Sequence, residues 1–336
     1  MRFNFLVVVF LSFFLVGCTT KREYFSPEKE EISGDFRYTQ KLDESIVFVT
    51  AKGATLEDGS VITKDGALSK IKLDKNEKFL TIAENKVLSS NIDGTFKIRD
   101  LDGNIVFEHK FPVQVISANL RGDDLALVSV DNTRYLMKMS SKTMILEEKN
   151  DIALAYDSRV AKPLFAGSGV IAYPMLDGRV AIIHAPTGGL VQEIFVSSEP
   201  FFNSVIYLDI VGDNLYAATG TVLLLNTATG NKRALENIRD IFKYQNKIYI
   251  FNEDGNVKIY DMNLNKLREK KFRFAIFSAA MPKDGSIYIF EKTGYLIKTD
   301  LNLENEQIFE LDDEIDELSF INEFAFYYDD EYAELK

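Results

Sequence analysis

The chain has 336 residues, with 39 basic and 51 acidic side chains, so its formal net charge is −12. This acidic balance argues against sequence-independent binding of nucleic acid, which requires Lys and Arg to neutralise phosphates. The single cysteine, Cys18, excludes an internal disulfide and a cysteine-based zinc site.

Residues 1–17 predict a signal peptide that ends at a lipid-modified cysteine. Arg2 precedes an apolar run of about twelve residues, which is too short to span a bilayer. Leu15-Val16-Gly17-Cys18 matches the lipobox of bacterial lipoproteins. In that class Asp after the cysteine retains the protein in the inner membrane, and Thr19 stands here instead. We therefore expect a lipid anchor on Cys18 and a place on the periplasmic side of the outer membrane.

Two alternatives to lipidation remain at this stage, namely an ordinary signal peptide with an incidental cysteine and an uncleaved anchor. Residues 18–34 are polar and charged, with one proline, and are expected to form a flexible tether. The folded domain is then expected to cover residues 35–336.

A turn signal recurs about every 39 residues along this domain. Asp-Gly pairs form several of the turns, and Asp-Gly between alternating apolar runs is a strong hairpin signal because type I′ turns require positive φ at both central residues. The recurring turn positions are Asp58, Asp93, Asp131, Asp177, Thr219, Asp254, Thr293 and Asp329.

Each repeat alternates apolar and polar residues on both sides of its turn, and no long segment has helical periodicity. Four short strands in roughly 40–45 residues are typical of one blade of a β-propeller. The most regular blade is predicted as Lys78–Ala83, Lys86–Asn91, Thr95–Asp100 and Asn104–Phe111. The sequence thus indicates an all-β fold.

Eight turns predict an eight-bladed β-propeller, with a seven-bladed ring as the alternative if residues 45–74 form a decoration. The last blade runs out of chain at Lys336 before its outer strand. Asp35–Lys41 is not used elsewhere, so we expect this N-terminal segment to close the ring and remove an exposed sheet edge.

Two of the repeats resemble the PQQ-like repeat of quinoprotein dehydrogenases and of BamB-like lipoproteins of the outer-membrane β-barrel assembly machinery. The matching residues are Leu176-Asp177-Gly178-Arg179-Val180, Ala185-Pro186-Thr187-Gly188 and Asn226-Thr227-Ala228-Thr229-Gly230. The chain departs from the family in having no tryptophan, so contacts between blades must depend on Phe, Leu and Ile. Together with the lipobox and the length, the pattern is similar to a divergent BamB-like protein.

Two connections between blades are longer than the others and contain residue types that anchor interfaces. The candidate partner-binding residues in them are Leu154, Tyr156, Arg159, Phe201 and Phe202. Packing of these residues on their own blades is the alternative. The resemblance implies that Leu154 and Arg159 correspond to a loop that contacts the periplasmic domains of the barrel-assembly pore protein.

Catalysis is not expected. His109 and His184 have no partner at ligand spacing, and no hydrolase, zinc-protease or nucleotide-binding motif occurs. We therefore expect no catalytic residue, metal or cofactor. The expected function is that of a monomeric, outer-membrane-anchored scaffold that binds the β-barrel assembly machinery and aids insertion of outer-membrane proteins. The alternative is an envelope propeller that binds another protein or a glycan.

Overall fold

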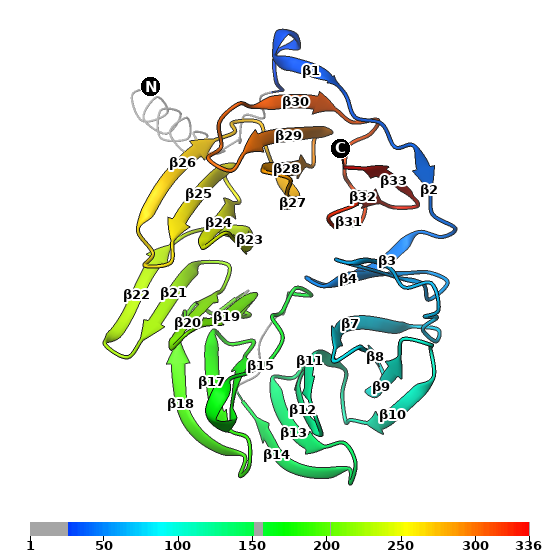
Figure 1. Ribbon diagram of the computed structural model, residues 1–336, viewed down its shortest axis with the longest axis vertical. Helices are drawn as coiled ribbons and strands as arrows, with labels where there is room; N and C mark the ends of the chain where they lie inside the picture. Colours follow the sequence, from blue (N-terminus) through cyan, green and yellow to red (C-terminus); the bar gives the residue numbers. More distant parts are fainter. Residues whose placement is uncertain (1–25, 151–156, 202, 336) are drawn as a thin grey trace, which may run out of the picture.

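The structure, a computed structural model, describes residues 26–150, 157–201 and 203–335 and forms a ring of eight β-sheets (Figure 1). Within these ranges the helical segments are two short 3-10 turns, η1 (Lys29–Glu31) and η2 (Gly167–Gly169). The eight-bladed propeller is therefore confirmed, and residues 45–74 are its first blade rather than a decoration. No helix in the described ranges is long and apolar enough to cross a membrane.

The first four blades are regular antiparallel meanders whose strands follow one another in the chain. Blade one comprises β3 (Ile46–Val49), β4 (Gly53–Leu56), β5 (Val61–Thr63) and β6 (Gly66–Ala67). Blade two comprises β7 (Glu77–Ala83), β8 (Lys86–Asn91), β9 (Thr95–Asp100) and β10 (Ile105–Lys110), and blade three comprises β11 (Val115–Arg121), β12 (Asp124–Ser129), β13 (Thr133–Lys138) and β14 (Thr143–Lys149). Blade four comprises β15 (Leu164–Phe165), β16 (Val170–Pro174), β17 (Arg179–His184) and β18 (Gly189–Phe195).

Blades five to seven continue the same order, and blade eight has three strands from the C-terminal end of the chain. Blade five comprises β19 (Tyr207–Val211), β20 (Asn214–Ala218), β21 (Val222–Thr227) and β22 (Gly230–Leu235). Blade six comprises β23 (Ile238–Tyr244), β24 (Lys247–Asn252), β25 (Asn256–Asp261) and β26 (Lys266–Lys271), and blade seven comprises β27 (Phe277–Lys283), β28 (Ser286–Glu291), β29 (Tyr295–Asp300) and β30 (Gln307–Glu310). The three strands of blade eight are β31 (Ser319–Ile321), β32 (Ala325–Tyr328) and β33 (Glu331–Glu334).

The N-terminal segment closes the ring, as the sequence predicted. Strand β2 (Gln40–Lys41) pairs antiparallel with β33 and is the outer strand of blade eight. Strand β1 (Ile32–Asp35) pairs parallel with β30 and adds a fifth strand to blade seven. The expectation that the tether reaches residue 34 is corrected here, because residues 32–34 belong to β1. The unpaired edge of β30 supplies the backbone partners that order this short polar strand.

The eight predicted turn positions all lie between the second and third strands of their blades. The expected type I′ geometry is wrong for the Asp93-Gly94 turn, in which Gly94 has φ of 88° and Asp93 does not have positive φ. The Gly94 N–H donates to the Asn91 carbonyl at 3.0 Å, and the Asp93 carboxylate accepts from the Thr95 N–H at 2.9 Å. The aspartate therefore caps a turn in which the left-handed conformation is taken by glycine.

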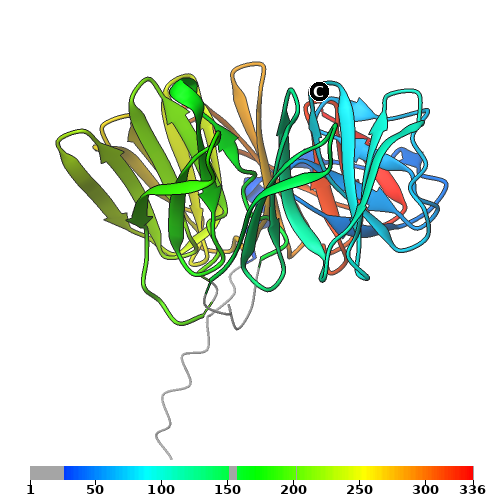
Figure 2. The ribbon, with the colours of Figure 1, turned by 90° about the horizontal axis from the view of Figure 1, so that it is seen from below.

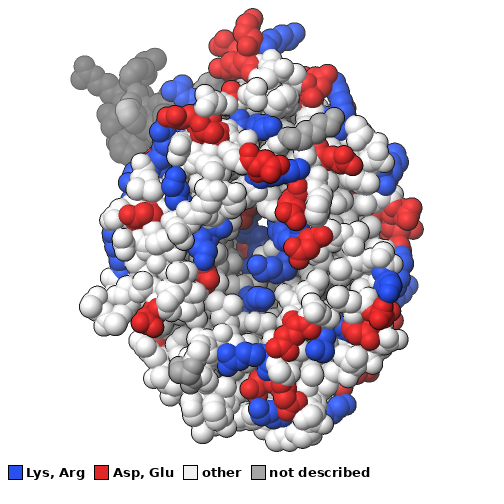
Figure 3. Space-filling model, in the orientation of Figure 1, with Lys and Arg blue, Asp and Glu red and all other residues white. Residues whose placement is uncertain are grey.

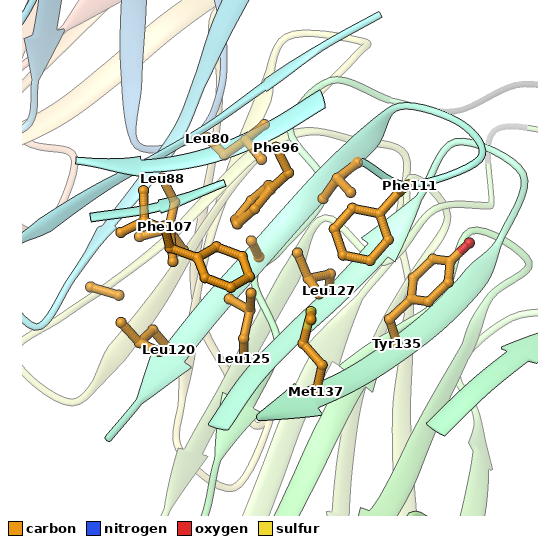
Figure 4. Packing of buried hydrophobic residues seen from close by; sticks show 14 residues of the cluster. Leu80, Leu88, Phe96, Phe107, Phe111, Leu120, Leu125, Leu127, Tyr135 and Met137 are labelled. Atoms are coloured by element: carbon orange, nitrogen blue, oxygen red, sulfur yellow. The ribbon is translucent and has the colours of Figure 1, made fainter. Parts of the chain in front are cut away.

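Hydrophobic clusters fill the interfaces between consecutive blades, one cluster at each of the eight interfaces in the described structure. Figure 4 shows the cluster between blades two and three, where Phe96, Phe107 and Phe111 face Leu127 and Tyr135. This arrangement confirms that Phe, Leu and Ile take the place of tryptophan. The first strand of every blade lines a central channel, which has a volume of about 890 Å³.

Candidate functional site

The two long connections that sequence analysis singled out both begin on the face of the ring that carries the turns between second and third strands, as the pairing of Thr133 with Lys149 shows for the first of them. The pairing of Arg179 with Phe195 places the end of β18 beside the start of β17, and therefore beside the Asp177 turn. The connection from β18 to β19 extends beyond the strands on that face (Figure 2). Of the predicted site residues, Cys18, Leu154, Tyr156 and Phe202 lie outside the described residues.

Arg159 lies at the mouth of the central channel. Its guanidinium donates to both carboxylate oxygens of Asp157, at 3.0 and 2.6 Å, and also to the backbone carbonyl of Arg239 in blade six. Burial alone would raise the pKa of Asp157, but the hydrogen bonds and charge of Arg159 outweigh it and the net shift is downward. Arg159 thus ties the connection before blade four to the first strand of blade six, two blades away around the channel.

Phe201 has a different environment from Arg159, because its side chain is 57 % exposed. Phe195 at the end of β18 and Leu235 at the end of β22 are also largely exposed, at 56 and 80 %. Leu235 pairs with Val222 at the start of β21, so it lies on the same face of the ring as Phe195. We call Phe195, Phe201 and Leu235 the apolar patch.

A hydrogen bond joins the two strands that carry Phe195 and Leu235, β18 of blade four and β22 of blade five. The Arg233 guanidinium in β22 donates to the Phe195 carbonyl of β18 at 2.6 Å. Isolated exposed apolar residues are common on protein surfaces, whereas several at one edge of adjacent blades are typical of an interaction site.

Sequence reasoning identified Phe201 but missed Phe195 and Leu235. Both lie in the outer strands of their blades, where alternation of apolar and polar residues does not distinguish a buried side from the rim. The outer strands β18 and β22 are mostly exposed, with burial confined to one or two positions. The repeat fixes which strand of each blade is the outermost, and this strand order is the signal that could have placed both residues at the outer edge of the ring.

The two histidines belong to different blades and are not brought together. His109 packs edge-on against Phe111, with ring centroids 4.7 Å apart, and burial followed by the charge of Lys142 lowers its pKa. His184 contacts the Thr187 hydroxyl through Nδ1 at 2.9 Å. In the part of the chain that the structure describes, no three His, Cys, Asp or Glu residues gather to form a metal site.

Comparison with known proteins gives relatives whose sequences align with most of this chain. No protein-family model matches it. The plasminogen-binding protein PgbB of Helicobacter pylori strain J99 is 27 % identical over 89 % of this chain and 63 % of its own length. Its counterpart from strain 26695 is 26 % identical over 89 % and 62 %, respectively. This chain therefore spans less than two thirds of the length of these curated relatives.

Several solved structures share the fold at low sequence identity. BamB from Moraxella catarrhalis has a TM-score of 0.66 and 13 % identity, covering 88 % of this chain and 98 % of that one. The C-terminal WD40 domain of Sif2 reaches 0.65 with 11 % identity, covering 90 % and 99 %. The computationally designed Ika8 protein reaches 0.64 with 10 % identity, covering 90 % and 100 %. This chain is thus similar to BamB in its β-propeller fold, and to other propellers to the same extent.

Proposed function

We propose that this chain is a binding propeller of the bacterial cell envelope, with no catalytic activity, anchored by lipid on Cys18. The support for the anchor is the lipobox Leu15-Val16-Gly17-Cys18 after an apolar run that is too short to span a bilayer. The support for a binding role is the propeller itself together with the apolar patch, since exposed aromatic and aliphatic residues anchor protein interfaces.

The partner that we propose is a host protein, with plasminogen as the first candidate. The observation that carries this choice is the 27 % identity to a plasminogen-binding protein along 89 % of the chain. The likeness to BamB is weaker support for a partner, because a designed propeller is equally similar in structure. A shared fold alone does not determine function.

The experiment is binding of the full chain, purified in detergent, to immobilised plasminogen. We expect the wild-type chain to bind and the variant Phe195→Ser/Phe201→Ser/Leu235→Ser to bind at least tenfold more weakly, because anchors of an interface contribute most of its free energy. The control is Ile92→Ser, since Ile92 is 70 % exposed in a turn on the same face of blade two.

Absence of binding by the wild-type chain would contradict plasminogen as the partner. Equal binding by the patch variant and the wild-type chain would contradict the apolar patch as the docking surface. Thermal unfolding of each variant shows whether the fold is intact, which we expect because all four positions are exposed.

A second candidate function is scaffolding of β-barrel assembly, favoured by the resemblance of the repeats at Asp177-Gly178 and Thr229-Gly230 to BamB-like proteins. A photo-crosslinking residue at position 201 in intact cells tests it. Adducts with the barrel-assembly pore protein would support this candidate. Adducts formed only with other proteins, or none at all, would exclude it for this surface.

A further inference from the structure

The central channel differs in charge from the rest of the protein. The whole chain has a net charge of −12, yet seven of the twelve charged side chains that line the channel are Lys or Arg. Figure 3 shows basic side chains gathered around the central hollow. A channel that is more basic than its surroundings concentrates anions, because low-dielectric walls focus the field of the charges inside it.

The acidic side chains of the channel are mostly engaged by neighbours. Asp157 is held by Arg159, Asp209 forms an ion pair with Lys243, and Asp316 accepts a hydrogen bond from the Tyr328 hydroxyl. Asp157 and Asp209 therefore already share their charge with a cation, whereas Asp316, Asp240 and Glu317 form no ion pair in the described residues, and the channel keeps a small excess of positive charge.

Four lysines of the channel, Lys52, Lys64, Lys162 and Lys292, form no ion pair within 4 Å in the described part of the chain, unlike Lys243. Lys292 lies near Asp316 and helps to lower the pKa of that carboxyl, so Lys292 is set apart from the other three. Lys52 lies in the turn from β3 to β4 and Lys64 in the turn from β5 to β6, so both are at the same end of blade one. Lys162 precedes β15 and enters the channel from blade four. We call these three residues the lysine site.

Lys64 is held in place by groups that carry no net charge, and no carboxylate contacts it directly. Its ammonium donates to the Ile321 carbonyl at 2.6 Å and lies 4.6 Å from the centroid of the Phe320 ring. Burial lowers the pKa of Lys64 to about 8, with Asp240 opposing the shift and Lys52 adding to it. Burial and then the charge of Lys52 also lower the pKa of Lys162. Lys52 therefore acts on both of the other lysines.

We propose that the lysine site binds a small organic anion that carries carboxylate or phosphate groups. Lys64 and Lys162 are half-buried, whereas Lys52 is exposed. A half-buried ammonium group is costly without a counter-charge, and an anion bound at Lys64 and Lys162, beside Lys52, would supply that charge. The channel volume of about 890 Å³ falls within the range of small-molecule sites. The proposal is independent of the docking function, because the apolar patch lies outside the channel.

Isothermal titration calorimetry of the full chain with citrate and with inorganic pyrophosphate, at low ionic strength, tests the proposal. We expect saturable binding of at least one of them, about tenfold weaker in Lys64→Gln and in Lys162→Gln, since one lost ion pair is worth about a factor of ten. The control is Lys75→Gln, an exposed lysine between β6 and β7 that removes the same charge outside the channel. Whichever anion binds more tightly identifies the group, carboxylate or phosphate, that the site prefers.

A second readout at pH 8 separates the lysine site from unspecific attraction of anions. An anion beside Lys64 raises its pKa, so binding should take up as much as about half a proton from the buffer. Titrations in two buffers with different ionisation enthalpies measure that uptake, which Lys64→Gln should abolish. Lys64→Gln should keep the wild-type unfolding temperature or raise it, because an uncompensated buried charge is removed. No binding of either anion, or equal binding by wild type and both lysine-site variants, would overturn the proposal.

Discussion

Phe290 of blade seven and Phe326 of blade eight stack face to face, with ring centroids 3.8 Å apart and ring planes 6° apart. The N-terminal segment covers this pair. Phe36 packs edge-on against Phe290 at 5.6 Å, and Tyr38 stacks on Phe326 at 6.4 Å. The interface between blades seven and eight is therefore built from residues at both ends of the chain, next to the pairing of β2 with β33 that closes the ring.

Phe326→Ala should lower the free energy of unfolding by about 3–5 kcal/mol, because a fully buried ring is replaced by a cavity. Urea unfolding followed by circular dichroism measures this loss. The control is Phe324→Ala in the same blade, where the ring is 51 % exposed and the expected change is within about 0.5 kcal/mol. Similar losses for the two variants would contradict a special role for the stacked pair.

Asp312 fixes the closing segment through two contacts, with the Arg37 guanidinium at 2.5 Å and the Tyr38 N–H at 2.8 Å. In Asp312→Ala we expect amide hydrogen exchange in β2 to become several-fold faster, because local opening of this segment needs less free energy. Hydrogen exchange read by mass spectrometry tests this, with Asp313→Ala as the neighbouring control. Unchanged exchange in Asp312→Ala would show that the aromatic contacts alone hold β2.

The repeat made much of this fold predictable from the sequence. Turn residues at a spacing of about 39 mark the same point in each blade, and the incomplete last blade required an outer strand from the N-terminal end. The predicted strand Lys78–Ala83 corresponds to β7 (Glu77–Ala83), and Lys86–Asn91 to β8. Strands of this kind are predictable because both their alternation and their turns are local signals.

Features that depend on contacts distant in the sequence were not predictable. Strand β1 has the sequence Ile-Ser-Gly-Asp, which carries no strand signal, and it forms because β30 offers an unpaired edge. Arg159 is directed into the channel by Asp157 and by the Arg239 carbonyl of blade six, which no local pattern reveals. The lysine site joins blades one and four, and sequence analysis did not single out any of its three residues.

The buried ion pair in blade two gives a third stability prediction. The Arg99 guanidinium donates to both oxygens of Glu77, at 2.6 and 2.8 Å, and both side chains are 3 % exposed. Glu77→Leu should lower the free energy of unfolding by about 3 kcal/mol or more, because the Arg99 charge then stays buried with less compensation. The double variant Glu77→Leu/Arg99→Met should lower the free energy of unfolding by less than Glu77→Leu alone, because it leaves no buried charge at position 99.

Chemical denaturation of the two single variants and the double variant completes a thermodynamic cycle for this pair. The exposed pair Lys70–Asp102 is the control, because both side chains are more than 60 % exposed and Lys70→Met should leave stability unchanged. Additive effects of the Glu77 and Arg99 substitutions would contradict direct coupling between the two residues.

Glu291 makes the stability of blade seven depend on pH. Its side chain is fully buried, and burial raises its pKa from 4.5 to about 7 even though the Thr293 and Tyr295 N–H groups donate to it. The folded state therefore binds more protons than the unfolded state between pH 4.5 and 7. This contribution to stability is complete below pH 4.5 and is lost as the pH rises through 7, by on the order of 3 kcal/mol.

Glu291→Gln should remove this dependence while keeping an oxygen that accepts hydrogen bonds. The measured quantity is the difference in free energy of unfolding between the wild type and Glu291→Gln from pH 5 to pH 8. Taking the difference cancels His109, whose lowered pKa makes stability rise with pH in the same range. As the pH rises, the wild type should lose free energy of unfolding relative to Glu291→Gln, and this difference should level off above pH 7. A difference that stays constant across the range would mean that Glu291 is ionised throughout and that its four hydrogen-bond donors outweigh burial.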